Sequence, residues 1–155
     1  MKLKNMALRL LAATLALTTA LISLVSCNNG GDTAGSVKIV ICDTEAVEYE
    51  VNLADIGEGN GIIPVLEYLK TNKNVNYTSQ DSGYGAYLTE LGALKEDALA
   101  GKFLYVYTSV EADFDVSQNA VTVEYNGQTL TSSGVGLSAM TVKDGAVIYF
   151  TYIVY

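Results

Sequence analysis

The chain of 155 residues carries 17 acidic side chains against 9 lysines and arginines, which gives a formal net charge of −8 at pH 7. A surface of this sign repels phosphate backbones, so we expect no nucleic-acid partner. The chain also has no histidine, which removes the usual base for a serine nucleophile and favours a protein that is not an enzyme.

The N-terminus predicts a lipid anchor. An uncharged apolar run over residues 10–24 follows three cations, Lys2, Lys4 and Arg9. The run ends in LVSC at residues 24–27, which resembles the lipobox of bacterial lipoprotein precursors, where the cysteine is lipidated and becomes the first residue of the mature chain. We therefore expect a signal peptide over residues 1–26, lipidation at Cys27 and an extracytoplasmic location on the bacterial cell membrane. A membrane-spanning anchor is the alternative, but it is disfavoured because the uncharged run over residues 10–26 is at the short limit for a bilayer core of about 30 Å and no stop-transfer charges follow it.

The remaining residues form a tether and one domain. Residues 27–36 are rich in glycine and asparagine and predict a flexible tether, whereas residues 37–155, 119 in all, suit a single domain. Without the signal peptide the chain has a net charge of −11. Cys42 is then the only cysteine besides Cys27, so no intramolecular disulfide can form, and we interpret Cys42 as a small hydrophobic residue in a strand.

The first part of the domain predicts a hairpin and a helix. Apolar residues alternate over 37–42 and again over 47–51, on either side of a turn at 43–45. Asn60 is the expected N-cap of a helix with Pro64 in its first turn, and residues 70–74 are expected to end it. The helix should place one apolar side toward the core, made of Ile62, Ile63, Leu66 and Leu69.

The middle of the domain is the least regular in its pattern. We expect a short strand over residues 75–77 and a glycine-rich turn over 80–85. Residues 86–91 suit either a strand or a helix, and we interpret the chain from there to Gly101 as irregular with helical turns, because Gly92 weakens a continuous helix.

Four further strands are predicted toward the C-terminus. Residues 103–107 are apolar on both faces, and Asn126-Gly127 predicts a hairpin between residues 120–125 and 128–131. Residues 146–155 carry apolar side chains on both faces, which predicts a central strand that is covered on both sides.

Four segments carry a resemblance to a known family. They are GYGAYL at residues 83–88, GKFLYVY at 101–107, SGVG at 133–136 and VKDG at 142–145. Together with the order of elements, they resemble the transcobalamin-like C-terminal domain family over nearly all of residues 37–155. The resemblance implies an α+β, ubiquitin-like β-grasp fold, with a mixed sheet of about five strands, one crossing helix and an extra hairpin. In vitamin B12 carriers such a domain forms half of the corrinoid site and an α-barrel forms the other half.

Other motifs give little support for chemistry. Residues 57–61 (GEGNG) lack the further glycine, or the lysine and hydroxyl residue, of a phosphate-binding loop. Glu111, Asp113 and Asp115 could offer oxygens to calcium, but a solvated acidic loop is favoured, so no metal site is expected. No cofactor is expected either, and cobalamin is implied by the resemblance alone.

Tyrosine is the distinctive side chain, with 11 copies and no tryptophan. The candidate ligand- or partner-binding residues lie around the glycine turn and in the strand after it, and they are Tyr84, Tyr87, Phe103, Tyr105 and Tyr107. We expect a membrane-anchored binding module for a surface protein, with capture of a small, corrinoid-like ligand as the alternative. A concave aromatic pocket beside Tyr84 and Tyr105 would favour the small ligand, and an exposed flat edge strand would favour the protein partner.

Overall fold

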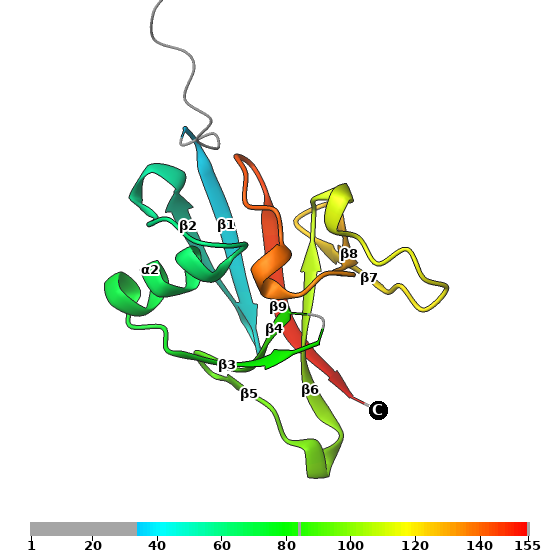
Figure 1. The fold of residues 1–155 in the computed structure, drawn as a ribbon. Helices are drawn as coiled ribbons and strands as arrows, with labels where there is room; N and C mark the ends of the chain where they lie inside the picture. The colour runs from blue at the N-terminus through cyan, green and yellow to red at the C-terminus, as the bar shows by residue number, and fades with distance from the viewer. Residues whose placement is uncertain (1–33, 84, 155) are drawn as a thin grey trace, which may run out of the picture. The chain divides into compact units, whose positions relative to one another are not determined.

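The computed structural model describes residues 34–83 and 85–154, which form a mixed α+β fold. A six-stranded mixed sheet has the order β2-β1-β9-β6-β8-β7, and a three-stranded sheet has the order β3-β4-β5 (Figure 1). The predicted signal peptide, Cys27, the first residues of the predicted tether and Tyr84 lie outside the described residues. Within the described part of the chain, no helix is both long and apolar enough to cross a membrane.

The described part of the chain contains nine strands, one α-helix and four short 3-10 turns. The strands and the helix are β1 Ser36–Cys42, β2 Ala46–Asn52, α2 Ile63–Lys73, β3 Tyr77–Ser82, β4 Gly85–Leu91, β5 Leu94–Lys95, β6 Lys102–Thr108, β7 Thr122–Tyr125, β8 Gln128–Ser132 and β9 Val147–Val154. The 3-10 turns are η1 Leu53–Asp55, η2 Ala98–Ala100, η3 Glu111–Asp113 and η4 Leu137–Ala139.

The C-terminal strand β9 is central, as the sequence predicts. It pairs in parallel with β1 and antiparallel with β6. Ile148 and Phe150 are buried on one face of the sheet, and Tyr149 is buried on the other. The predicted hairpins β1–β2 and β7–β8 are also confirmed, and both Asn126 and Gly127 have the positive φ that the tight turn requires.

The helix α2 starts later than predicted. Its cap position is Ile62, not Asn60, and no side chain caps it. The Ile62 N–H instead donates to the Leu137 carbonyl at 2.9 Å, and a Cβ at Gly61 would collide with that same carbonyl. A tertiary contact with η4 therefore sets the start of the helix, which local capping rules cannot foresee.

The segment from residue 75 to 101 differs most from the prediction. The strand expected at 75–77 lies at Tyr77–Ser82, and the stretch interpreted as irregular contains β4 and β5. Ala86, Leu88 and Leu91 point into the core, because β4 buries alternate residues up to a bulge and then turns at Gly92, which has φ +58°. The single predicted sheet is thus two sheets.

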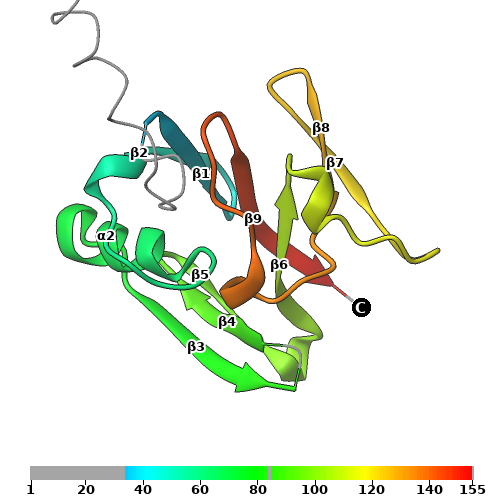
Figure 2. The same cartoon turned by 45° about the horizontal axis from the view of Figure 1, so that its top comes forward.

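Two hydrophobic cores lie on opposite faces of the six-stranded sheet. The main core joins this sheet to α2 and to the three-stranded sheet. The second core is smaller, and its buried members are Val40, Tyr107, Leu130 and Tyr149. The β7–β8 hairpin covers it, and the hairpin tip reaches β2 through Asn126 Nδ2, which lies 3.5 Å from Glu48 Oε1. In Figure 2 this hairpin and α2 lie on opposite sides of β9 and β6.

The acidic segment at η3 is hydrogen-bonded to the chain between β8 and β9. Asp113 is only 3% exposed, and its carboxylate accepts hydrogen bonds from the Thr141 N–H at 2.7 Å and from Thr141 Oγ1 at 2.8 Å. The Asp113 carbonyl accepts from the Gly134 N–H at 2.8 Å. The prediction of a solvated loop is therefore wrong for Asp113, because this residue fixes the chain that leads from β8 to β9.

Deleting residues 146–155 should abolish folding, because it removes the strand that both β1 and β6 pair with and that both cores cover. Thermal unfolding followed by circular dichroism should then show no cooperative transition. A sharp transition in the truncated chain would contradict the central role of β9.

Replacing Asp113 by alanine should lower the free energy of unfolding by roughly 2–4 kcal/mol, because the partly buried Thr141 N–H and hydroxyl lose their acceptor. Urea unfolding would measure this difference. The control is Glu111→Ala, which removes an exposed carboxylate from the same 3-10 turn and should change stability by less than about 0.5 kcal/mol. Equal effects of the two substitutions would show that the hydrogen bonds from Thr141 to Asp113 do not stabilise the fold.

Candidate functional site

An apolar hollow opens between the two sheets, where β4 faces β6. We call it the inter-sheet pocket. Its volume is about 90 Å³. Its lining comes from β4, β6, β9 and the segment that leads into η4, and it consists of Ala86, Tyr87, Leu88, Leu104, Tyr105, Val106, Val135, Gly136, Leu137 and Phe150.

Two short strand pairings lie next to the pocket. β5 pairs with β4 only at Glu90 and Leu91, and β8 pairs with β6 only at Tyr107 and Thr108. Beyond these points the two strands diverge from their neighbours. Leu104 and Val106 alternate toward the main core and form one wall of the hollow.

The opposite wall comes from a close approach of backbone. Gly85 has φ +102°, and a Cβ there would lie 3.0 Å from Ser138 Oγ and 3.6 Å from the Gly136 Cα. A larger residue at this position would therefore push η4 away from β4. This explains why the glycine turn that the sequence singles out lies beside the pocket.

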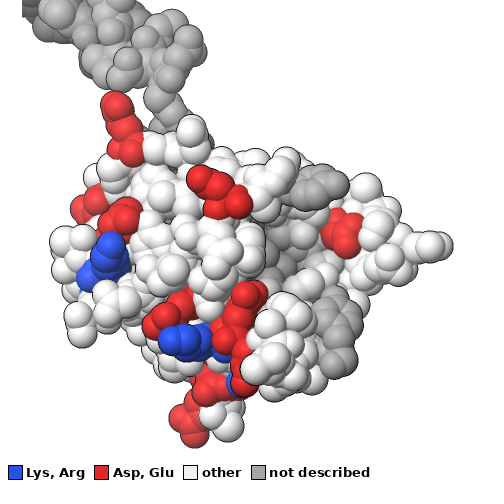
Figure 3. Space-filling view, turned by 60° about the horizontal axis from the view of Figure 1, so that its bottom comes forward, with Lys and Arg blue, Asp and Glu red and all other residues white. Residues whose placement is uncertain are grey.

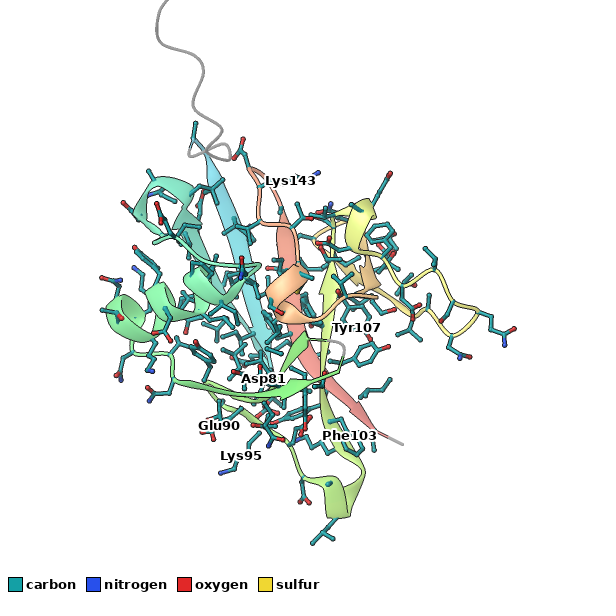
Figure 4. The ribbon with its side chains drawn as sticks, viewed as in Figure 1. Asp81, Glu90, Lys95, Phe103, Tyr107 and Lys143 are labelled. Atoms are coloured by element: carbon teal, nitrogen blue, oxygen red, sulfur yellow. The ribbon has the colours of Figure 1, made fainter. Side chains whose placement is uncertain are left out.

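Charged groups surround the pocket without lining it. The Leu104 N–H donates to Glu96 Oε1 at 3.3 Å, and Lys95 Nζ lies 3.8 Å from a Glu90 carboxylate oxygen. Lys102 Nζ lies 3.5 Å from the centre of the Tyr152 ring. Asp81, Glu90 and Lys95 lie on the three-stranded sheet in Figure 4, and the face in Figure 3 shows more acidic than basic side chains.

Two of the predicted aromatic residues, Tyr87 and Tyr105, border the inter-sheet pocket from facing strands. Tyr87 adjoins the pocket, but its ring lies on the outer face of the three-stranded sheet, where it is 42% exposed and its hydroxyl donates to Gln80 Oε1 at 3.1 Å. Tyr84 is outside the described residues. Ala86 and Leu88, the inward neighbours of Tyr87 on β4, bury their side chains here.

The other three aromatic residues belong to the far face of β6. Phe103, Tyr105 and Tyr107 alternate with Leu104 and Val106 and so belong to the other face of β6, although Tyr105 also borders the pocket, and Figure 4 shows Phe103 and Tyr107 on this strand. Tyr107 is only 8% exposed and packs edge-on against Tyr105 and Tyr149, with ring centres 5.4 Å and 6.2 Å away. Tyr107 is therefore part of the second core.

Sequence reasoning missed the aliphatic residues that form most of the pocket. They include Leu104, Val106 and Val135, and the aromatic Phe150 lies beside them. All four lie in apolar stretches of sequence that are equally well explained as ordinary core. The useful signal was the apolar character of both faces of residues 103–107, since it requires a second layer over each face of β6.

The titratable groups with shifted pKa values lie away from the pocket. Burial, with a smaller effect of the nearby Glu67, raises the pKa of Tyr77 to about 12. Burial and Glu48 likewise raise the pKa of Tyr125 to about 12. Burial, followed by Cys42, raises the pKa of Tyr149. These three residues support the fold, and none of them lines the pocket.

Metal ligands do not converge in the part of the chain that the structure describes. Among residues 34–83 and 85–154, no three histidine, cysteine, aspartate or glutamate side chains lie close enough to hold a metal ion. The carboxylate of Asp113 accepts from Thr141, whereas that of Asp115 accepts from the Ser117 N–H at 2.8 Å. Asp113 and Asp115 thus have different hydrogen-bond partners within the protein.

Comparisons with known proteins find similar folds among solved structures. No protein-family model and no curated protein matches the sequence. A protein from Ruminococcus gnavus ATCC 29149, named as a candidate metal-binding protein, is similar in structure with a TM-score of 0.50 and 10% identity, over 78% of this chain and 98% of that one. Haptocorrin in complex with Cbi is similar with a TM-score of 0.56 and 16% identity, over 86% of this chain and 28% of haptocorrin. The chain therefore spans little more than a quarter of haptocorrin, and the two similarities support a transcobalamin-like fold.

Proposed function

We propose that the domain is a non-catalytic binding module that recognises a protein partner through the inter-sheet pocket. The observation that carries the proposal is the size and chemistry of this pocket. Its volume of about 90 Å³ is well below the roughly 300–1,000 Å³ of typical small-molecule sites, and its lining is mostly aliphatic. A hollow of this kind suits one apolar side chain of a partner, in the manner of an interface hot spot.

Two further features support a protein partner. β3 is an edge strand of the three-stranded sheet, and every residue after Tyr77 in it is exposed, so it offers an extended backbone for strand pairing. The acids Asp81, Glu90 and Glu96 border this region and favour a partner segment with basic residues beside its apolar anchor.

The second candidate function is capture of a corrinoid. Similarity to haptocorrin in complex with Cbi favours it, as does the resemblance of the sequence to the transcobalamin-like family. On this proposal the fold is of the β-grasp type, and the domain supplies half of a site that a second protein completes. The small volume of the inter-sheet pocket favours the protein partner over the corrinoid.

Filling the pocket should weaken partner binding. We expect peptides selected from a random display library against the full-length chain to carry a central leucine or phenylalanine with basic neighbours. Val135→Phe should weaken their binding by about 2 kcal/mol, or roughly 30-fold in Kd, because the new ring occupies the pocket. Fluorescence polarisation would measure the affinities.

The control is Val116→Phe, which makes the same change at a residue that is almost fully exposed and outside the pocket. It should leave peptide affinity unchanged. Peptides that bind Val135→Phe as well as the natural chain would refute the proposed site. Submicromolar binding of Cbi by calorimetry, lost in Val135→Phe, would support the second candidate function instead.

We also propose that Cys27 anchors the protein to the bacterial membrane from outside the cytoplasm, on the evidence of the lipobox-like sequence. Metabolic labelling with a palmitate analogue should modify the natural chain and leave Cys27→Ala unlabelled. Cys42→Ala is the matched control and should be labelled normally. Labelling of Cys27→Ala, or its normal processing and retention in membranes, would contradict the proposal.

A further inference from the structure

A second hollow lies on the opposite face of β6 from the inter-sheet pocket. We call it the tyrosine cleft. It is lined by Tyr105, Ile153 and the segment before β7, with residues Gln118, Asn119, Ala120 and Val121. Its volume is about 510 Å³, which falls within the roughly 300–1,000 Å³ of typical small-molecule sites.

The lining of the cleft combines an apolar floor with an amide rim. Tyr105 and Ile153 come from neighbouring strands, because Ile153 pairs with Phe103 on the same face of the sheet. Gln118 and Asn119 are exposed, and neither carboxamide makes a hydrogen bond to another described residue. Among the residues that the structure describes, no charged side chain lines the cleft.

Hydrogen bonds hold one wall of the cleft in place, and ring packing holds the other. The Ser117 N–H donates to Asp115 Oδ1 at 2.8 Å, and the Asn119 N–H donates to Ser117 Oγ at 3.2 Å. The Val121 N–H donates to Ser132 Oγ at 3.1 Å, which ties the segment to β8. On the other wall, Tyr105 packs edge-on against Tyr107, which the second core holds. An ordered cleft loses less conformational entropy when a ligand binds.

These features define the chemistry of the occupant. A purely apolar ligand would leave the carboxamides of Gln118 and Asn119 unpaired, and an ionic ligand would find no counter-charge in the lining. A neutral ring with polar groups around its edge satisfies both conditions, because its flat apolar face can lie on the Tyr105 ring while its edge bonds to the amides. We propose that the tyrosine cleft binds a neutral saccharide, with Tyr105 as the platform and Gln118 and Asn119 as the hydrogen-bonding rim.

This site does not rest on the proposed protein-binding function, since Tyr105 is the one residue that the two linings share and Gln118 and Asn119 lie outside the inter-sheet pocket. A glycan array that displays neutral, sialylated and sulfated oligosaccharides tests it, probed with the full-length chain in detergent. We expect binding to neutral glycans, with the affinity for the best one measured by calorimetry. Binding to no glycan, or to sulfated and sialylated glycans alone, would overturn the proposal.

Variants then locate the site. Tyr105→Ala should weaken binding of that neutral glycan at least tenfold, and the double variant Gln118→Ala, Asn119→Ala should weaken it about fivefold. The double variant changes exposed residues only, so it separates recognition from folding. Gln128→Ala, the same change on β8 outside the cleft, and Val135→Phe, in the inter-sheet pocket, should both bind like the natural chain. Unchanged affinity in the double variant and in Tyr105→Ala would place the glycan elsewhere and refute the assignment.

Discussion

β9 is hydrogen-bonded to β1 on one side and to β6 on the other, and its two faces enter two different cores. This double burial is the constraint on which the rest of the structure depends. The main core positions α2 and the three-stranded sheet, and the second core positions the β7–β8 hairpin. Both hollows described above therefore owe their shape to side chains that alternate along β9 and its neighbour β6.

The two hollows differ because the partners that cover β6 differ. On one face, β4 and the segment that leads into η4 leave a hollow of about 90 Å³. On the other face, the segment before β7 leaves a hollow of about 510 Å³. The first fits one side chain of a protein, and the second fits a whole small molecule. β6 thus contributes to two hollows of different chemistry, for which we propose two different kinds of ligand.

Local signals predicted the elements whose formation is local. The period of residues 37–51, the Asn126-Gly127 turn and the apolar last strand gave the right hairpins and the central position of β9. The start of α2 and the separate sheet of β3, β4 and β5 were missed, because contacts distant in sequence decide them, such as the bond from Ile62 to Leu137. The candidate aromatic residues were chosen from their closeness in sequence. Alternation along β6 and β4 places the four described ones on different faces of the sheets, and among these four Tyr105 borders both hollows.

Asp113 connects the walls of both hollows. Its carboxylate and carbonyl hold Thr141 and Gly134, which flank the segment at the inter-sheet pocket, and two residues later the Asp115 N–H bonds to the Ser132 carbonyl at 2.8 Å, beside the tyrosine cleft. The two walls therefore belong to one cooperative unit of local unfolding. Amide protons of residues 133–141 and of residues 115–121 should exchange with deuterium through a shared opening, so that a ligand in one hollow slows exchange around the other.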